Sequence, residues 1–152
     1  MESKNIATNK KAFRNYFVVD RYECGIELKG SEVKSVRAGH VHFRDSFARI
    51  EKKEILLHSL HIDPYAQASY LNPDSDRARK LLLHKNEIKK ILGQMIQKGL
   101  TLVPLSIFLN KHNFVKVSLG LVKGKKLYDK RETIKKRDIK KDLDRAVRTS
   151  RK

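Results

Sequence analysis

The chain has 152 residues, the length of one domain with a single hydrophobic core. Thirty-five Lys and Arg residues against seventeen Asp and Glu residues give a net charge of +18. Because so basic a protein repels itself, its charge predicts a polyanionic partner, and nucleic acid is the first candidate. No apolar run approaches the ~18 residues that cross a membrane, and the first residues lack the apolar segment of a secretory signal. We therefore expect a cytoplasmic protein without a membrane partner.

The N-terminal part of the chain predicts two strands and a short helix. Residues 17–19 and 24–28 have the apolar pattern of β-strands. Residues 32–38 predict a helix, with Ser31 as its N-cap and Gly39 in the left-handed position that follows the last turn.

A β-hairpin is predicted next, from residues 46–51 and 55–62 around the polar Lys-Lys-Glu sequence between them. Alternate residues of the second strand are expected to share one face, namely Leu56, His58, Leu60 and Ile62. Residues 63–79 contain two prolines and several turn-forming polar residues, and predict a long loop.

The clearest helix covers residues 85–98, where apolar residues recur at three- and four-residue intervals and Gly99 follows as a stop. Its apolar stripe is expected to pack in the core and consists of Ile88, Ile91, Leu92, Met95 and Ile96. Residues 102–109 and 114–122 then predict two more strands, joined by a turn at 110–113.

Together these elements predict a mainly β domain, residues 1–122. Its expected architecture is a partly open antiparallel barrel of the OB (oligonucleotide-binding) type with embedded short helices. Residues 123–152 differ, because fourteen Lys and Arg against five Asp and Glu give them a net charge of +9, half that of the chain. Their few apolar residues are typical of a narrow helix stripe and do not hold an isolated helix together. We expect a basic C-terminal tail that is disordered when free and folds to a helix on a negatively charged partner.

No residue pattern predicts catalysis. The single cysteine, Cys24, excludes an internal disulfide and a cysteine-based zinc site, and we expect a reduced thiol that acts as a small hydrophobe. His40 and His42 would project from one face of a strand, yet no third ligand recurs at a diagnostic spacing. Neither a phosphate-binding GxxxxGK[ST] loop nor a GxSxG motif occurs. We expect no catalytic residue, metal or cofactor; an RNA-processing enzyme is an alternative without a supporting motif.

Two segments, 10–17 and 123–131, interleave basic with aromatic residues. Cations neutralise phosphates, while Phe and Tyr rings stack on unpaired bases. At least two of Phe13, Tyr16 and Phe17 are expected to lie partly in the core. The pattern predicts an RNA-binding protein, and a general ribosome-associated OB-type protein is the alternative that shares this charge.

Five strings in this order resemble the SsrA-binding protein (small protein B) family over nearly the whole chain. They are NKKA at 9–12, CGIELKGSEVKSVRAG at 24–39, RARKLLLH at 77–84, GLTLVPL at 99–105 and GKKLYDKRE at 124–132. The resemblance implies an OB-like barrel that binds the tRNA-like domain of transfer-messenger RNA (tmRNA). It further implies delivery of alanylated tmRNA, with elongation factor Tu and GTP, to stalled ribosomes for trans-translation. The tail would enter the empty mRNA channel near the decoding centre of the small subunit. We expect a monomer.

The family's motifs also imply which residues of the body contact tmRNA, namely Glu23, Lys34, Arg37, Lys80, Leu82 and His84. Glu23 would accept a hydrogen bond from a base edge, and the cations would meet phosphates. The chain departs from the pattern at His84, where some relatives have Asn, and at Arg14 and Asn15, where relatives often have His and an acid.

In the tail, the same motifs imply ribosome contacts for Lys125, Lys126, Tyr128, Asp129, Lys130 and Arg131. Tyr128 stands where other members carry His, and its ring would stack on a decoding-centre base. Asp129 is equally well interpreted as the N-cap of a following helix.

Overall fold

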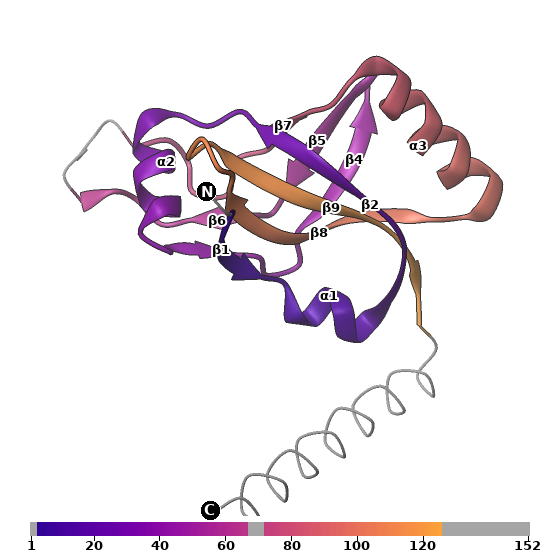
Figure 1. The fold of residues 1–152 in the computed structure, drawn as a ribbon, viewed down its shortest axis with the longest axis horizontal. Helices are drawn as coiled ribbons and strands as arrows, with labels where there is room; N and C mark the ends of the chain where they lie inside the picture. Colours follow the sequence, from indigo (N-terminus) through magenta and orange to yellow (C-terminus); the bar gives the residue numbers. More distant parts are fainter. Residues whose placement is uncertain (1–2, 67–71, 126–152) are drawn as a thin grey trace, which may run out of the picture.

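The structure is a computed structural model that describes residues 3–66 and 72–125 (Figure 1). The described residues form nine β-strands, namely β1 (Lys4–Thr8), β2 (Tyr16–Ile26), β3 (Val41–His42), β4 (Phe47–Glu51), β5 (Glu54–His58), β6 (His61–Ile62), β7 (Arg79–Leu82), β8 (Thr101–Leu109) and β9 (Val115–Gly124). They also form three α-helices, namely α1 (Lys10–Asn15), α2 (Gly30–Arg37) and α3 (Lys85–Lys98). Among these described residues, no helix has the length and apolar character needed to traverse a bilayer.

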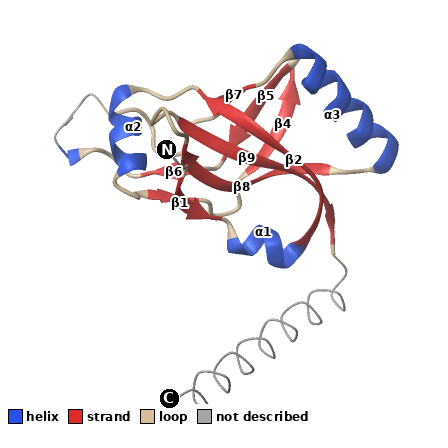
Figure 2. Cartoon of the chain, viewed as in Figure 1, coloured by secondary structure: helices blue, strands red, loops and turns tan. Residues whose placement is uncertain are grey.

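Seven of the strands form one antiparallel sheet that closes on itself (Figure 2). They follow the order β1-β8-β4-β5-β7-β2-β9, and β9 pairs in turn with β8. The junction of β4 with β8 rests on one aligned pair, Ala48 with Leu102, so the barrel is only partly closed there. With short helices between the strands, this arrangement confirms the predicted OB-like, mainly β fold.

The long strand β2 forms because its inward and outward positions alternate. From Tyr16 to Glu23, half-buried and exposed side chains follow one another, and Cys24 is fully buried. This two-residue period is that of a strand with one face on the core and the other in solvent. The sequence predicted two shorter strands here; the structure has one, and its outward face carries Glu23.

The strand β8 is buried on both faces. Leu102 and Ile107 pack into the main core, whereas Leu105 packs into a second, smaller apolar cluster. Leu102 and Ile107 face the same side despite their odd spacing, because the register with β9 shifts between Pro104 and Ser106. Proline has no N–H to donate, and such a bulge is where a strand tolerates it.

The buried side chain of Asn9 joins α1 to β8. Its Oδ1 accepts a hydrogen bond from the backbone N–H of Ala12 at 3.2 Å, which makes Asn9 the N-cap of α1. Its Nδ2 donates to the carbonyl oxygen of Pro104 at 2.8 Å. Its backbone N–H donates to the carbonyl oxygen of Leu105, also at 2.8 Å. Neither α1 nor β1 was predicted from the sequence.

The aromatic residues around α1 divide between core and surface. Phe13 and Tyr16 pack against the smaller apolar cluster. Phe17 lies on the outer face of β2 and is 47% exposed. The prediction that at least two of the three lie partly in the core is confirmed.

The helix α2 starts differently from the prediction. Its N-cap is Lys29, so the predicted N-cap, Ser31, is wrong. The backbone N–H of Lys29 donates to the Glu32 carboxylate at 2.9 Å, and this bond takes the place of a serine cap. Gly39 has a φ of 84°, which confirms the predicted left-handed residue after the helix.

The hairpin of β4 and β5 is confirmed, but its second strand is shorter than predicted. Ser59 has a φ of 64°, which interrupts the strand and reverses the alternation of side chains. Ile55 and Leu57 are buried before this point, and Leu60 and Ile62 are buried after it. The predicted common face is therefore wrong for the set Leu56, His58, Leu60 and Ile62.

The helix α3 has the predicted bounds, and Gly99 ends it with a φ of 63°. Ile91 is buried, and Ile88 and Met95 pack partly against the main core. The predicted burial of the complete stripe is wrong, because two of its residues, Leu92 and Ile96, are 40% and 77% exposed. The helix lies at one end of the barrel (Figure 1), where only a narrow side of it meets the core.

The remaining expected elements agree with the structure. The described residues between β6 and β7 contain no strand or α-helix, as expected for a loop. The last two strands and their turn are confirmed as β8 and β9. Because β9 ends at Gly124, the sheet includes the first two residues assigned to the tail. Residues 126–152 lie outside the described residues, so the conformation of the tail stays a prediction.

Candidate RNA-binding face

Three neighbouring strands form the outer face that carries most of the predicted site. Leu82 on β7, Gly25 on β2 and Lys116 on β9 are aligned across the sheet. Because directly paired residues of antiparallel strands point to the same face, Leu82 and Lys116 flank Gly25. A Cβ atom on Gly25 would lie 3.1 Å from the Cβ of Leu82. Because Gly25 has no side chain, Leu82 has room beside β2, the middle strand of the three. Leu82 is 48% exposed.

Glu23 and His84 adjoin this row. Glu23 is exposed and lies two residues before Gly25 on β2, and His84 is the N-cap residue of α3. Together with Leu82 they line a concavity of about 310 Å³. The structure thus brings three of the predicted contact residues into one place.

These three side chains suit a nucleic-acid base better than its backbone. A carboxylate such as that of Glu23 repels phosphates but can accept hydrogen bonds from the amino groups of base edges. The imidazole of His84 donates a hydrogen bond or stacks, and Leu82 offers an apolar surface. Glu87 and Lys116 also line the concavity, so its charge is mixed.

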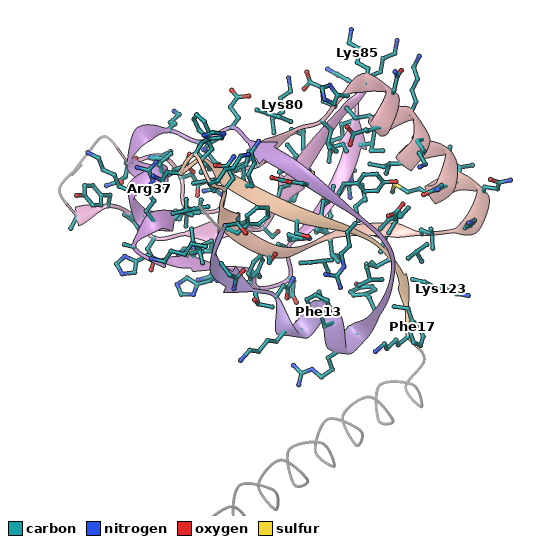
Figure 3. All side chains as sticks on the ribbon, viewed as in Figure 1. Phe13, Phe17, Arg37, Lys80, Lys85 and Lys123 are labelled. Carbon is teal, nitrogen blue, oxygen red and sulfur yellow. The ribbon has the colours of Figure 1, made fainter. Side chains whose placement is uncertain are left out.

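Helix α2 supplies cations beside this face (Figure 3). Arg37 is exposed, and its Nη2 donates to the carbonyl oxygen of Asn113 at 2.8 Å. It lines a second concavity, of about 220 Å³. This concavity shares three residues with the first, namely Gly25, Leu82 and Lys116. Lys34 lines neither, and its Nζ lies 5.3 Å from the centroid of the Tyr65 ring.

Lys80 lies two residues before Leu82 on β7, at the edge of the same face. Its Nζ is 3.2 Å from Oε1 of Glu54, and both side chains are well exposed. An exposed ion pair of this kind stabilises a protein by about 0–1 kcal/mol. If Lys80 leaves Glu54 to bind a phosphate, the protein therefore loses little stabilising free energy.

Sequence reasoning missed two residues of this face, Phe114 and Lys116. Both line the second concavity, and Phe114 is 64% exposed. The motif strings do not cover this segment, and an aromatic residue at the start of an apolar strand was expected to belong to the sheet. The available signal was the alternation along β9, which places 114 and 116 on the side opposite the buried Val117.

Cys24 lies between Glu23 and Gly25 and points the other way, into the core. Its side chain is 0% exposed, and burial, aided by the nearby Glu87 carboxylate, raises the pKa of its thiol to about 12. The thiol is therefore protonated and unreactive at neutral pH. The prediction that Cys24 packs as a small hydrophobe is confirmed.

The residue at which the described chain ends, Lys125, is tied to the body. Its backbone N–H donates to the carbonyl oxygen of Asn15 at 2.9 Å, and its Nζ donates to that of Phe13 at 3.3 Å. The same Nζ lies 4.9 Å from the centroid of the Phe17 ring. The other predicted tail contacts, Lys126, Tyr128, Asp129, Lys130 and Arg131, lie outside the described residues.

Arg14 and Asn15, where the chain departs from the family pattern, are on α1 and line neither of these concavities. Asn15 instead contributes to a separate hollow of about 320 Å³ beside α1. At its mouth Lys11 forms an ion pair with Asp45, which lowers the pKa of that carboxyl group. Arg14 and Asn15 therefore lie on a different part of the surface from the two concavities of the candidate RNA-binding face.

The histidines make local contacts. His42 and His61 pair across β3 and β6, and Asp63 lies 3.3 Å from one ring and 3.1 Å from the other. Across residues 3–66 and 72–125, no group of three or more His, Cys, Asp or Glu side chains is placed to hold a metal ion. The pairing of His40 with His42, considered from the sequence, is replaced by this cross-strand pair.

The fold and the face together define a class. A small OB-like barrel, a net charge of +18, and a groove lined by polar, apolar and cationic side chains are typical of an RNA-binding protein.

Comparison with known proteins narrows this class. The family described as "SmpB protein" matches residues 6–149. The SsrA-binding protein of Carboxydothermus hydrogenoformans is 52% identical over 145 residues, 95% of this chain and 97% of the relative. That of Bacillus subtilis (strain 168) is 51% identical over 149 residues, 98% of this chain and 95% of the relative. The chain belongs to the SsrA-binding protein (SmpB) family, as its sequence resemblance indicated.

A solved structure agrees with this assignment. It matches with a TM-score of 0.68 and 50% sequence identity, covering 84% of this chain and 93% of the other. That chain comes from work on tmRNA-SmpB at the centre of the bacterial ribosome.

Proposed function

We propose that this chain binds the tRNA-like domain of tmRNA and delivers it to stalled ribosomes for trans-translation, the rescue reaction that ends in peptide tagging. The observation that carries the proposal is the groove of Glu23, Leu82 and His84 in a chain about half identical to SsrA-binding proteins. The similarity to a chain from a study of tmRNA-SmpB in the ribosome supports the same function.

Binding takes place on the face formed by β7, β2 and β9. Glu23 accepts a hydrogen bond from the edge of an exposed base, and His84 completes the polar contact. Arg37, Lys34 and Lys80 meet phosphates around it, and Leu82 packs against the apolar part of a nucleotide. A folded RNA elbow is recognised by its shape and its unpaired bases, and this mixture of contacts matches that mode.

The basic tail acts at the ribosome. The part of the tail that follows β9 and Lys125 enters the mRNA channel when it is empty and folds to a helix against ribosomal RNA near the decoding centre. The contact residues are Lys125, Lys126, Tyr128, Asp129, Lys130 and Arg131. Because bound mRNA occupies the same channel, the tail distinguishes stalled from translating ribosomes by steric exclusion, without catalysis.

The remaining partners follow from the RNA. Elongation factor Tu with GTP binds the alanylated tmRNA and does not bind this chain directly. The chain acts as a monomer in the cytoplasm. The chain adds no chemical step of its own.

A competition experiment tests the proposal. Labelled tRNA-like domain of tmRNA is bound by the full chain and challenged with an unrelated hairpin of equal length at two salt concentrations. We expect a preference that persists at the higher salt, because base and shape contacts do not depend on counterion release. Loss of the preference, with affinity that only follows salt, would favour a general ribosome-associated RNA-binding protein instead.

A further inference from the structure

Phe114 presents an aromatic ring to solvent at a place where the fold does not need it. The ring is 64% exposed, more than that of Phe17 on the outer face of β2. Burial of a Phe side chain stabilises a protein by about 1.5–3 kcal/mol, and most of that stabilisation is absent here. A large apolar group left in water beside a functional groove indicates a contact surface.

The backbone of Phe114 is nevertheless fixed. Its N–H donates to Oδ1 of Asn110 at 2.9 Å, and its carbonyl oxygen accepts from the N–H of Asn110 at 3.0 Å. The turn is tied to α2 as well, since Arg37 donates to the carbonyl oxygen of Asn113. A ring on so constrained a backbone loses little conformational freedom when it binds a partner.

The surroundings of the ring are basic and continuous with the proposed tmRNA site. Phe114 lines the second concavity with Arg37 and Lys116. The two concavities meet at the Leu82–Gly25–Lys116 row, so one groove runs from His84 to Phe114. An aromatic ring and two cations that line one concavity can hold an unpaired base by stacking and its flanking phosphates by charge.

We propose that Phe114 is a stacking platform for an unpaired base of the RNA that occupies this groove, with Arg37 and Lys116 neutralising the adjacent phosphates. This inference rests on the proposed function and extends its site by two residues, Phe114 and Lys116. The two cations that line the same concavity as the ring favour RNA over an apolar protein segment as the occupant.

The test measures dissociation constants for the tRNA-like domain of tmRNA and for an unrelated hairpin. The variants are Phe114→Leu, which stays apolar but cannot stack, and Phe114→Trp, which keeps an aromatic face. Phe17→Leu is the matched control, an exposed phenylalanine outside the groove. We expect Phe114→Leu to weaken tRNA-like domain binding by roughly 5- to 150-fold, the contribution of one base–aromatic stack. Phe114→Trp is expected to retain binding.

A second readout separates stacking from charge. Phe114→Leu removes no charge, so the slope of affinity against salt is expected to stay as in the wild type. Lys116→Gln is expected to lower that slope by about 1, as for the loss of one phosphate contact. Because Phe114 is exposed, the melting temperature of Phe114→Leu should match that of Phe17→Leu, which excludes unfolding as the cause.

Two results would overturn the inference and are distinguishable. If the wild type prefers the tRNA-like domain but Phe114→Leu binds it as tightly as Phe17→Leu, the groove binds tmRNA without a stack at Phe114. If the wild type shows no preference over the hairpin, the proposed function fails, and the inference fails with it.

Discussion

The guanidinium group of Arg79 lies against the carboxylate of Glu32 inside the protein, with Nε 2.7 Å from Oε2. The two side chains are 0% and 3% exposed, although 47 residues separate them in the sequence. Arg79 also donates to the carbonyl oxygens of Leu60 and Ser75, at 2.6 and 2.9 Å, and Arg77 pairs with the same carboxylate. This network fastens α2, which carries Arg37, to β7, which carries Leu82.

Removing one partner of the Glu32–Arg79 pair is expected to lower the stability of the folded protein. Glu32→Gln leaves the buried Arg79 charge without a counter-ion, so we expect a loss of about 3–5 kcal/mol in the free energy of unfolding. Glu54→Gln, which removes a carboxylate from the exposed pair with Lys80, is the control and should cost about 1 kcal/mol or less. Denaturant unfolding of both variants measures the difference. Equal losses would show that the buried pair has no special role.

The same pair gives stability a pH dependence. Burial alone would raise the pKa of Glu32, but hydrogen bonds from Arg77, from the Lys29 N–H and from Arg79 outweigh it and hold the pKa below its ordinary value of 4.5. A depressed carboxyl pKa contributes stability that is present above the unfolded-state value and is lost as pH falls through the folded-state value. The stability gap between the wild type and Glu32→Gln should therefore narrow progressively as the pH falls below the ordinary carboxyl pKa of 4.5. A constant gap over this range would contradict the assignment.

Gly25 is expected to matter for RNA binding more than for folding. In Gly25→Ala the new Cβ lies 3.1 Å from the Cβ of Leu82 and 3.3 Å from its Cδ1, so the Leu82 side chain has to turn and its strand has to give by a few tenths of an ångström. We expect tRNA-like domain binding to weaken by up to about tenfold, or ~1.4 kcal/mol, with a smaller change in stability. The control is Gly30→Ala, because nothing lies within 4 Å of its added Cβ. If both variants bind RNA alike, the position of Leu82 is not critical.

Lys125 is expected to orient the tail through its contacts with the body. Lys125→Ala removes the bond to Phe13 and the contact with the Phe17 ring, so peptide tagging should fall while tRNA-like domain affinity stays unchanged. Lys123→Ala removes the same charge two residues earlier and is the control. Phe17→Leu keeps Lys125 but removes the ring beneath it, and should reproduce part of the tagging defect. Normal tagging by Phe17→Leu, with a defect in Lys125→Ala, would show that Lys125 acts only through its proposed ribosome contact and does not orient the tail.

Local pattern was enough to predict some elements of this fold. Helix α3 was predicted with its observed bounds, because apolar periodicity and the stop at Gly99 are both encoded within fifteen residues. The β4–β5 hairpin and the β8–β9 turn are local in the same sense. The short strands β3 and β6 were missed because their pairing brings together segments about twenty residues apart, and a single positive φ at Ser59 redirects the chain between β5 and β6.

The site was predictable where motif strings cover it and not elsewhere. Glu23, Leu82 and His84 were assigned by family resemblance, and the fold brings them to one concavity. Phe114 and Lys116 reach the same groove only because β9 is aligned with β2, which is a tertiary property. The Glu32–Arg79 pair that holds the two halves of the site was missed for the same reason.

The most direct test of the proposed role is reconstituted peptide tagging on ribosomes stalled at the end of an mRNA without a stop codon. Purified full-length chain is compared with a chain that ends at Lys125, and tRNA-like domain affinity is measured for both. We predict tagging by the full chain only, with equal RNA affinities, because the shortened chain keeps the barrel, the proposed RNA-binding face and the contacts of Lys125 with the barrel. Absence of tagging by the full chain, or undiminished tagging by the shortened chain, would contradict the proposed function of body and tail.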